Sequence, residues 1–195
     1  QMNKHDSEVI AGLLNEIGFQ CYNELIPDPD MILINTCAVR QNAENRALGR
    51  LGEMKQYKDR NPELIIGLCG CVAQELGAQL LERAEFLDFV VGPADIHNIA
   101  EIAVSAMTTT TKKRTAAVDS QSRNLSAATP HLRRSKTQAW VSIISGCNNY
   151  CSYCIVPFVR GPEISREPDD ILSEIETLLN AGYKEITLLG QNVNS

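Results

Sequence analysis

The sequence predicts an α/β protein: an open parallel sheet with flanking helices, then a linker, then the opening βαβ unit of a partial (β/α) barrel. Three observations lead to this prediction. Short apolar runs alternate with helix-spaced stretches over residues 1–106, a stretch rich in Thr, Ser, Ala and basic residues fills 107–136, and two more apolar runs flank an amphipathic stretch within 137–195. Strands that alternate with helices are typical of parallel sheets covered by helices. We therefore expect two domains, 1–106 and 137–195, joined by the segment 107–136.

The first segment contains three predicted strands and four predicted helices. The strands are the apolar runs at 31–35, 64–68 and 89–92, and the helices cover 9–17, 43–57, 74–83 and 96–104. Short continuous apolar runs are typical of strands that are buried on both faces of a parallel sheet. Asp6 is the expected cap of the first helix, Gly18 marks its end, and Pro62 interrupts the second helix.

The segment 107–136 differs in composition. It holds seven Lys or Arg residues, one acidic residue and few large apolar side chains. Such a stretch buries too little surface to offset the entropy of ordering, so we expect a partly disordered linker. The segments on either side are acidic and the chain carries a net charge of −6, which argues against nucleic-acid binding through bulk charge. The basic linker leaves a local contact with RNA phosphates open.

The third segment, 137–195, is expected to form one βαβ unit. Its strands are predicted at 139–146 and 185–190. Its helix, at 169–181, ends before Gly182 and carries five apolar residues on one face, namely Ile171, Leu172, Ile175, Leu178 and Leu179. A single unit of this kind does not bury both faces of its strands. We therefore expect further repeats after Ser195, and we interpret the chain as a piece of a longer protein that is inactive alone.

Seven cysteines are the most informative feature of the composition. Their number is odd, and the polar N-terminal stretch does not resemble a secretory signal. Metal or redox chemistry in a reducing cytosol is therefore favoured over a disulfide framework. No run of about 18 apolar residues occurs, so we expect no membrane-spanning helix. The expected location is the cytoplasm, or an organelle if a targeting segment precedes Gln1.

Three of the cysteines form a compact motif. Cys147, Cys151 and Cys154 lie within eight residues, in the loop after the strand predicted at 139–146. Thiolates are soft ligands that suit iron–sulfur clusters and zinc. A 4Fe–4S cluster with three cysteine ligands keeps one iron open for a small molecule. Structural zinc needs a fourth ligand, and this loop has no His and no other Cys. We favour the cluster; zinc and three unrelated thiols are the alternatives.

The motif continues beyond the third cysteine. Its characteristic residues are Cys151, Ser152, Cys154, Pro157, Arg160, Gly161, Ser165 and Arg166. This pattern resembles the radical S-adenosylmethionine (SAM) enzymes and, within them, the methylthiotransferases. The resemblance implies a radical SAM barrel and a 4Fe–4S cluster on Cys147, Cys151 and Cys154 that binds SAM through its open iron. Reductive cleavage of SAM then yields a 5′-deoxyadenosyl radical.

Cys37 and Cys71 form a second candidate site. Each directly follows a predicted strand, at 31–35 and 64–68 respectively. Because parallel strands end at the same edge of a sheet, where open α/β folds bind ligands, these two cysteines are expected to converge. Two buried core thiols are the alternative.

The stretches around these cysteines extend the resemblance. Residues 1–3 read QMN, 35–40 read NTCAVR and 70–74 read GCVAQ, all similar to the methylthiotransferases. In that family three cysteines of the N-terminal domain bind an auxiliary 4Fe–4S cluster tied to sulfur donation. The resemblance implies such a second cluster on Cys37 and Cys71, whose third ligand, a cysteine before Gln1, is absent from this sequence. Cys69 is interpreted as a core or spare thiol, and Cys21 matches no motif position.

Five other side chains near the three-cysteine loop have open roles. Tyr153 either shields the cluster or the SAM adenine, or packs within the loop. Gln191 and Asn192 either face SAM or form a polar turn. For Arg160 and Arg166 the alternatives are an anionic ligand and ion pairs with an acidic neighbour, namely Glu163, Glu167 or Asp169.

The last residues, 188–195, read LLGQNVNS. They resemble the branch that acts on tRNA carrying an isopentenyl group on the adenosine next to the anticodon. The resemblance implies methylthiolation at C2 of that adenosine, and we expect tRNA as substrate, a flavodoxin-type electron donor and a monomer. The alternatives are a methylthiotransferase that acts on an aspartate of a ribosomal protein and a non-catalytic metal-binding or electron-transfer module. An electron carrier usually has four ligands per cluster.

Overall fold

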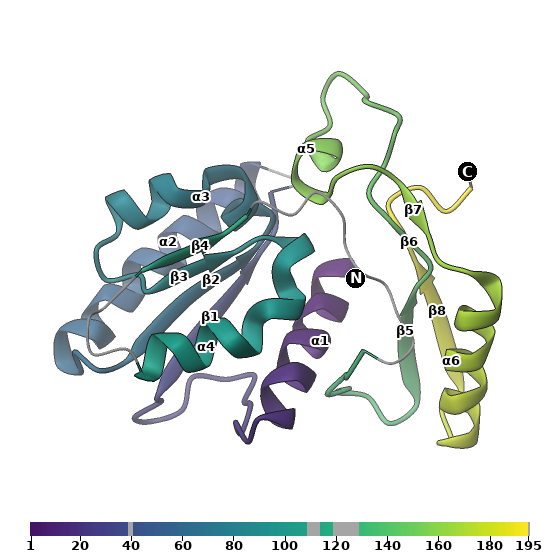
Figure 1. The fold of residues 1–195 in the computed structure, drawn as a ribbon, viewed down its shortest axis with the longest axis horizontal. Coiled ribbons are helices and arrows are strands. Elements are labelled where there is room, and N and C mark those ends of the chain that lie inside the picture. Colours follow the sequence, from purple (N-terminus) through teal and green to yellow (C-terminus); the bar gives the residue numbers. More distant parts are fainter. Residues whose placement is uncertain (39–40, 109–113, 119–128, 195) are drawn as a thin grey trace.

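The computed structural model describes residues 1–38, 41–108, 114–118 and 129–194. These residues form an α/β fold with a large parallel sheet and a smaller strand–helix unit beside it (Figure 1). Within the NTCAVR stretch, residues 39 and 40 lie outside the described part. No helix in the described part is both long enough and apolar enough to cross a membrane.

The larger sheet contains four strands in the order β1-β2-β3-β4, all parallel. The strands are β1 (Met31–Thr36), β2 (Ile65–Gly70), β3 (Phe89–Val91) and β4 (Thr115–Ala117). The helical elements are α1 (Met2–Glu16), α2 (Gln41–Arg60), α3 (Cys71–Arg83), η1 (Pro93–Asn98) and α4 (Ile99–Thr108). The open parallel sheet expected from the sequence is therefore confirmed.

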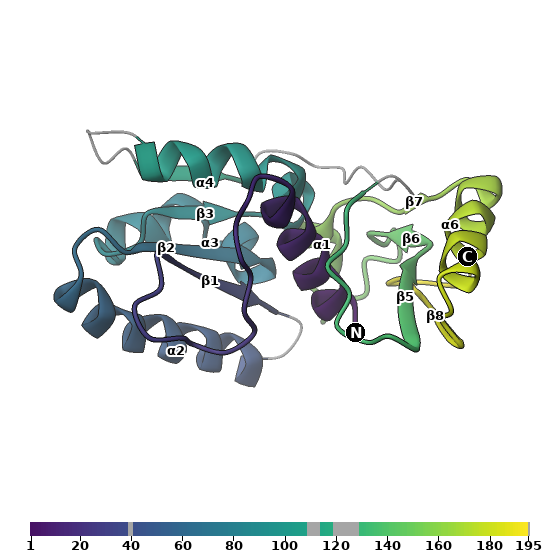
Figure 2. The same cartoon turned by 90° about the horizontal axis from the view of Figure 1, so that it is seen from below.

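Apolar residues of β2 alternate between two cores on the two faces of the sheet. Ile66 and Leu68 pack with α2 and α3, whereas Ile65 and Cys69 pack with α1 and α4. Figure 2 shows α2 and α4 on opposite sides of the sheet. Every residue of β2 and β3 is buried, which explains the continuous apolar runs in the sequence.

The boundaries of all four predicted helices of the first domain differ from the sequence prediction, and the starts of two differ in ways that matter for the candidate sites. The first helix begins at Met2, so Asp6 lies inside it and the prediction that Asp6 caps it is wrong. The Asp6 carboxylate pairs with a buried arginine, Arg160. The third helix begins at Cys71 rather than at residue 74, directly after β2. Gly18 follows the first helix and has φ +94°, the conformation in which a glycine commonly ends a helix, as the sequence predicted.

Part of the segment 107–136 belongs to the fold, contrary to the expectation of a linker throughout. The helix α4 extends to Thr108, and β4 is the edge strand of the sheet. The Arg114 side chain donates hydrogen bonds to the carbonyl oxygens of Leu81 and Ala84. Three small residues suffice at a sheet edge because their backbone hydrogen bonds, more than apolar burial, hold them there. Residues 109–113 and 119–128 of the expected linker lie outside the described residues.

The second unit contains the predicted βαβ arrangement. Its elements are β5 (Gln138–Ser142), β6 (Ile144–Ser145), α5 (Val156–Arg160), β7 (Ile164–Ser165), α6 (Pro168–Asn180) and β8 (Glu185–Leu189). Strands β5 and β8 are parallel, and β6 pairs with β7 in antiparallel fashion. The strand predicted at 139–146 is thus split at Ile143, whose N–H donates to Leu189 O and whose carbonyl accepts from Arg166 N, both at 2.9 Å.

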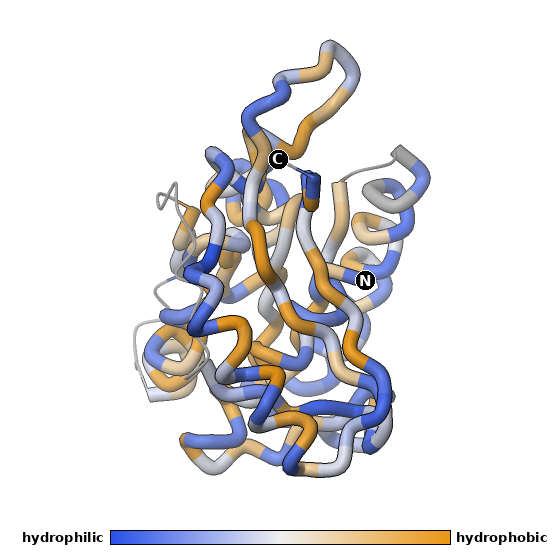
Figure 3. The backbone as a smooth tube through the Cα atoms, turned by 90° about the vertical axis from the view of Figure 1, so that its right-hand side faces the viewer, coloured by the Kyte–Doolittle hydropathy of each residue, from blue (hydrophilic) through white to orange (hydrophobic). Residues whose placement is uncertain are grey.

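The apolar face of α6 is narrower than the sequence indicates. Ile171, Ile175 and Leu178 pack against β5 and β8, but Leu172 and Leu179 are 56% and 55% exposed. The helix covers only two strands here, so only its central apolar stripe is buried. Figure 3 looks onto this side of the molecule and shows apolar positions alternating with polar ones along the chain.

The short helix α5 joins the two units. Val159 is buried in the same core as Leu68 and Val72 of the large sheet, and Ile155 packs against that core. Figure 1 shows α5 between the helices of the large sheet and the smaller unit. The chain that follows the three-cysteine loop is therefore anchored in the first domain.

Candidate metal centres

Cys37 and Cys71 lie at the same edge of the large sheet. Thr36 and Gly70 are paired at the carboxyl ends of β1 and β2, and each cysteine directly follows its paired residue. Cys37 is close enough to Cys71 to contribute to the rise in the pKa of the Cys71 thiol. The convergence expected from parallel-strand topology is thus present in the structure. We name the residues Asn35–Cys37 and Gly70–Cys71 the sulfur edge.

Side-chain hydrogen bonds of Thr36 fix the sulfur edge. Thr36 Oγ1 donates to the carbonyl oxygen of Cys69 at 2.6 Å and accepts from the backbone N–H of Val72 at 3.2 Å. The hydroxyl of the NTC stretch therefore ties the end of β1 to the first turn of α3. These two bonds hold the backbone on which both cysteines sit.

Asn3 connects the start of α1 to the sulfur edge. Its side chain donates to Asn35 Oδ1 at 2.8 Å and to Thr36 O at 2.9 Å. In return Asn35 Nδ2 donates to Asn3 O at 2.8 Å and to Ser7 Oγ at 2.9 Å. The QMN stretch is therefore in direct contact with the NTC stretch, and the N-terminal end of α1 lies at the sulfur edge.

Gly70 allows the two strand ends to approach closely. Its φ is +94°, a conformation that side-chain-bearing residues rarely adopt. A Cβ at this position would lie 2.6 Å from Asn35 Oδ1 and closer still to Thr36 O. The glycine of the GCVAQ stretch is therefore a condition for the geometry of the sulfur edge.

A buried ion pair lies beside Cys71. Arg160 Nη2 donates to Asp6 Oδ2 at 2.7 Å, and their side chains are 5% and 0% exposed. Burial raises the pKa of the Cys71 thiol, and the Arg160 guanidinium opposes that rise. The sequence pattern suggested for Arg160 an anionic ligand or the pairing partners Glu163, Glu167 or Asp169. The actual partner, Asp6, comes from the other domain, which local spacing does not reveal.

The remaining N-terminal cysteines are not at the sulfur edge. Cys69 is fully buried in the core on the α1 and α4 face, and burial raises its pKa to about 12. Its assignment as a core thiol is confirmed. Cys71, in contrast, packs in the core on the opposite face, so the two do not share a side. Cys21 packs against the Cys69 core, with its thiol 3.7 Å from Ala11 O.

The three-cysteine loop is open to solvent along most of its length. Cys147 is buried at the end of β6, Cys154 is half-buried and Cys151 is exposed. A turn in which Cys154 N donates to Cys151 O at 2.9 Å links two of these cysteines through the backbone. Beside them, Tyr153 is 90% exposed, and Tyr150 packs edge-to-face with Phe158 at 6.2 Å.

The base of this loop is more tightly held than its tip. Gly146 has φ +76°, and a Cβ there would meet Gly161 O at 2.5 Å. Its N–H donates to Gln191 Oε1 at 2.6 Å, and Cys147 N donates to Gly161 O at 3.3 Å. Asn192 donates to Glu163 Oε2 at 3.2 Å. Gln191 therefore supports the loop from the end of β8.

The thiol groups of the cysteines are suitable ligands for an iron–sulfur group, but they are not yet arranged around one. All seven are free thiols, and three of them share one loop. The described residues contain no group of three His, Cys, Asp or Glu side chains already arranged around a metal. Soft thiol donors on an exposed loop can gather around a cluster as it is inserted.

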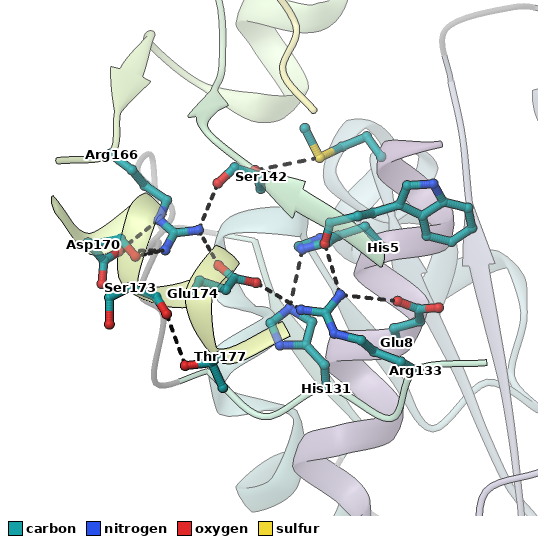
Figure 4. A network of polar contacts seen from close by, with 12 residues as sticks. His5, Glu8, His131, Arg133, Ser142, Arg166, Asp170, Ser173, Glu174 and Thr177 are labelled. Carbon is teal, nitrogen blue, oxygen red and sulfur yellow. Dashed lines mark hydrogen bonds and ion pairs between the residues drawn. The ribbon is translucent and has the colours of Figure 1, made fainter. Parts of the chain in front are cut away.

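A network of buried ion pairs joins Arg166 and helix α6, through Arg133, to helix α1 (Figure 4). Arg166 binds Glu174 and Asp170 at 2.7 and 2.6 Å, and Arg133 binds Glu174 at 2.8 Å and approaches Glu8 at 3.8 Å. Arg166 thus forms an ion pair, as one alternative held, although with other acidic residues. Arg133 also lies in buried ion pairs, so this basic residue is not exposed to RNA phosphates. No local pattern predicted the contact between Glu8 and Arg133, because the two residues are far apart along the chain.

Comparisons with known proteins agree with the two-part organisation. Residues 1–92 match the family described as "Uncharacterized protein family UPF0004", and residues 141–195 match "Radical SAM superfamily". Relatives that match along the whole of this chain include proteins from Halalkalibacterium halodurans (47% identical), Bacillus subtilis (44%) and Thermoanaerobacter pseudethanolicus (46%). Each is named tRNA-2-methylthio-N(6)-dimethylallyladenosine synthase.

The chain spans 36%, 38% and 41% of the length of these three curated relatives. The radical SAM match includes the three-cysteine loop, and the UPF0004 match includes the sulfur edge. Membership of the radical SAM superfamily implies SAM and a 4Fe–4S cluster as cofactors. The chain therefore carries a UPF0004 match followed by a radical SAM match, and along its whole length it is similar to relatives of one name.

Proposed function

We propose that the chain is part of a tRNA-modifying enzyme. Its reaction is the radical SAM-dependent methylthiolation of C2 in the N6-isopentenylated adenosine next to the anticodon. The names of the relatives support this substrate. The structural observation that carries the proposal is the position of α5, which follows Cys154 and packs its Val159 and Arg160 against the core and sulfur edge of the first domain.

Cys147, Cys151 and Cys154 are the proposed ligands of the cluster that binds SAM. When bound there, the cluster and SAM supply the carbon radical that attacks the substrate. The chain's own residues hold the loop in place. Gln191 accepts a hydrogen bond from Gly146, and the positive φ of Gly146 allows its backbone to lie close to Gly161. The exposed tip leaves room for ligands on the Cys151 side.

Cys37 and Cys71 are the proposed ligands of a second, auxiliary 4Fe–4S cluster. Their common edge and the hydrogen bonds of Thr36 support this assignment. The third ligand is expected from a cysteine before Gln1, as the family resemblance implies. The contacts of Asn3 support that position because they hold the N-terminal end of α1 at the sulfur edge.

The proposal includes the domain division at 1–106, 107–136 and 137–195, with the described parts of the middle segment attached to both units. It also includes tRNA and a flavodoxin-type electron donor as partners, a monomeric enzyme and a location in the cytoplasm. Size-exclusion chromatography of the complete protein with and without tRNA tests the monomer and the tRNA complex.

The function is tested by nucleoside analysis of tRNA from cells that lack the gene. The complete gene is expected to restore the 2-methylthio group on isopentenyladenosine, and the Cys151→Ala variant is expected not to. Cys21→Ala, which lies outside both sites, is the matched control and is expected to restore it. If tRNA is unaffected and a ribosomal-protein aspartate loses its methylthio group instead, the proposed substrate is wrong.

Anaerobic reconstitution tests the cofactors separately from the substrate. Iron, sulfide and a broad visible absorption are expected in the complete protein. One bound zinc without that absorption contradicts an enzyme of this kind and favours a non-catalytic metal-binding module.

A further inference from the structure

Arg160 is placed where two otherwise separate parts of the chain meet. It is the last residue of α5, which follows the three-cysteine loop, yet its side chain is buried against α1 of the first domain. One guanidinium nitrogen, Nη2, binds Asp6 at 2.7 Å. The other, Nη1, is buried and has no hydrogen bond of good geometry among the described residues, although the Cys71 thiol lies close enough to interact with the guanidinium.

An N–H of a buried cation that lacks a well-placed acceptor destabilises the folded protein. Such a group is retained where an acceptor completes it in the working molecule. The neighbour that supplies one is the sulfur edge, because Cys71 lies beside the guanidinium and Cys37 lies beside Cys71. Thiolate and sulfide sulfur atoms accept hydrogen bonds, and such bonds shift the reduction potential of an iron–sulfur cluster.

We propose that Arg160 is a positioning residue of the auxiliary site: from the radical SAM segment it brings one hydrogen-bond donor and a positive charge to the sulfur atoms at Cys37 and Cys71. This proposal rests on the proposed function, which assigns those cysteines to a cluster. Arg160 thereby raises the reduction potential of that cluster, since a nearby cation stabilises the form that has gained an electron.

Asp6 sets how much of that charge the sulfur edge experiences. Its carboxylate neutralises the guanidinium from the α1 side, and its own effect on the Cys71 thiol is weaker than that of Arg160. Removing Arg160 and removing Asp6 therefore shift the potential in opposite directions. A purely structural role predicts no such opposition, because both substitutions break the same ion pair.

Arg166 is a matched control in the same chain. It is as deeply buried as Arg160, but its guanidinium binds Asp170, Glu174 and the carbonyl of Ser142. These partners belong to the ion-pair network on the α6 side (Figure 4), and none of them is a cysteine. Arg166→Gln therefore reports what the loss of a buried ion pair does by itself.

The test uses the complete protein, reconstituted without oxygen, in a Cys147→Ala, Cys151→Ala, Cys154→Ala background that leaves the auxiliary cluster as the sole source of signal. The midpoint potential is measured by EPR-monitored titration. Arg160→Gln is expected to lower it by an amount equal to about a tenfold change in the ratio of reduced to oxidised cluster, 59 mV for one electron. Asp6→Asn is expected to raise it, Arg160→Lys to keep it nearer the parent value, and Arg166→Gln to leave it unchanged.

The double variant Asp6→Asn, Arg160→Gln guards against misfolding, because it leaves no lone buried charge. Its potential is expected between those of the two single variants. Equal potentials in all variants, or shifts of the same sign for Asp6→Asn and Arg160→Gln, overturn the role of Arg160 while leaving the proposed function intact. Absence of any cluster signal in the triple-cysteine background, or a signal that survives Cys71→Ala unchanged, overturns the two-cluster assignment and the Arg160 proposal together.

Discussion

The two cysteine sites of this chain are built in opposite ways. At the sulfur edge, two strand ends are fixed by the Thr36 hydroxyl, by the paired Asn3 and Asn35 amides and by a glycine that permits close approach. At the three-cysteine loop, the base is held by Gln191, but Cys151 and its neighbours are exposed and the thiols are not gathered. The fold fixes the positions of the cysteines in the first site, whereas it leaves those of the second site apart.

This difference has a physical origin. A loop at the end of a strand has few backbone partners of its own, so its conformation is decided by whatever the side chains bind. Strand ends at a sheet edge inherit their spacing from the ladder, as Thr36 and Gly70 do. Substitutions should accordingly act on activity at the loop and on stability at the edge.

The largest expected effect is on activity at the loop. Replacing Cys147, Cys151 or Cys154 by Ala removes one of three proposed cluster ligands, so tRNA methylthiolation by the complete enzyme should become undetectable. Because the Cys151 side chain is exposed, Cys151→Ala should change the unfolding free energy of the apoprotein by less than about 0.5 kcal/mol. Methylthiolation and denaturant titration of each variant check the two expectations. Retained modification in any of the three contradicts the assignment.

The next effect concerns the attachment of the second unit. Arg166→Gln replaces one of the two cationic partners of the buried Glu174 by a neutral amide. Because Arg133 remains as the other partner, the cost is expected at the lower end of the range for a broken buried pair, about 3 kcal/mol. Arg50→Gln, which breaks the exposed pair with Glu53, should cost no more than about 1 kcal/mol. Chemical denaturation of the apoproteins measures both values. Similar losses for the two variants would mean that the network in Figure 4 does not stabilise the fold.

A smaller effect is expected at the sulfur edge itself. Gly70→Ala places a Cβ against Thr36 O at positive φ, which should lower the unfolding free energy by about 3 kcal/mol through strain and crowding. Gly182 has φ +91°, but a Cβ there would meet no described atom within 4 Å, so Gly182→Ala should cost only about 1 kcal/mol. Thermal unfolding compares the two. Equal losses would show that close approach at the edge contributes nothing.

The smallest effect at neutral pH is that of Cys69, whose contribution appears only in alkaline solution. Burial raises the pKa of Cys69 to about 12 from an ordinary value of 9.0. Below pH 9 both folded and unfolded states keep the proton. Between pH 9 and about 12 the unfolded state loses it first, so stability falls by about 1.4 kcal/mol per pH unit. In Cys69→Ala this contribution to the slope should vanish, whereas Cys151→Ala should retain it. A slope that is the same in both variants and in the parent excludes Cys69 as its source.

Local patterns in the sequence predicted three of the four strands of the large sheet, most of the helices and the meeting of Cys37 with Cys71, because apolar period is a local property and parallel strands end at one edge. What they did not predict depends on residues far apart in the chain. Asp6 looked like a helix cap because its partner, Arg160, lies in another segment. Arg133 looked like part of a solvated linker because Glu174 and Glu8 are remote from it in sequence. β4 has almost no apolar signal, since the strand beside it supplies its hydrogen bonds.

The packing of α5 in the core of the large sheet restricts how the two parts of the chain can be exchanged between relatives. Val159 packs in that core and Arg160 pairs with Asp6, so the radical SAM segment contributes side chains to the interior of the first domain. A chimera that exchanges the UPF0004 half between two relatives must transfer α5 with it, or choose parents that agree at both positions. A chimera that leaves α5 behind is expected to be destabilised, because Val159 and Arg160 no longer match the core and Asp6.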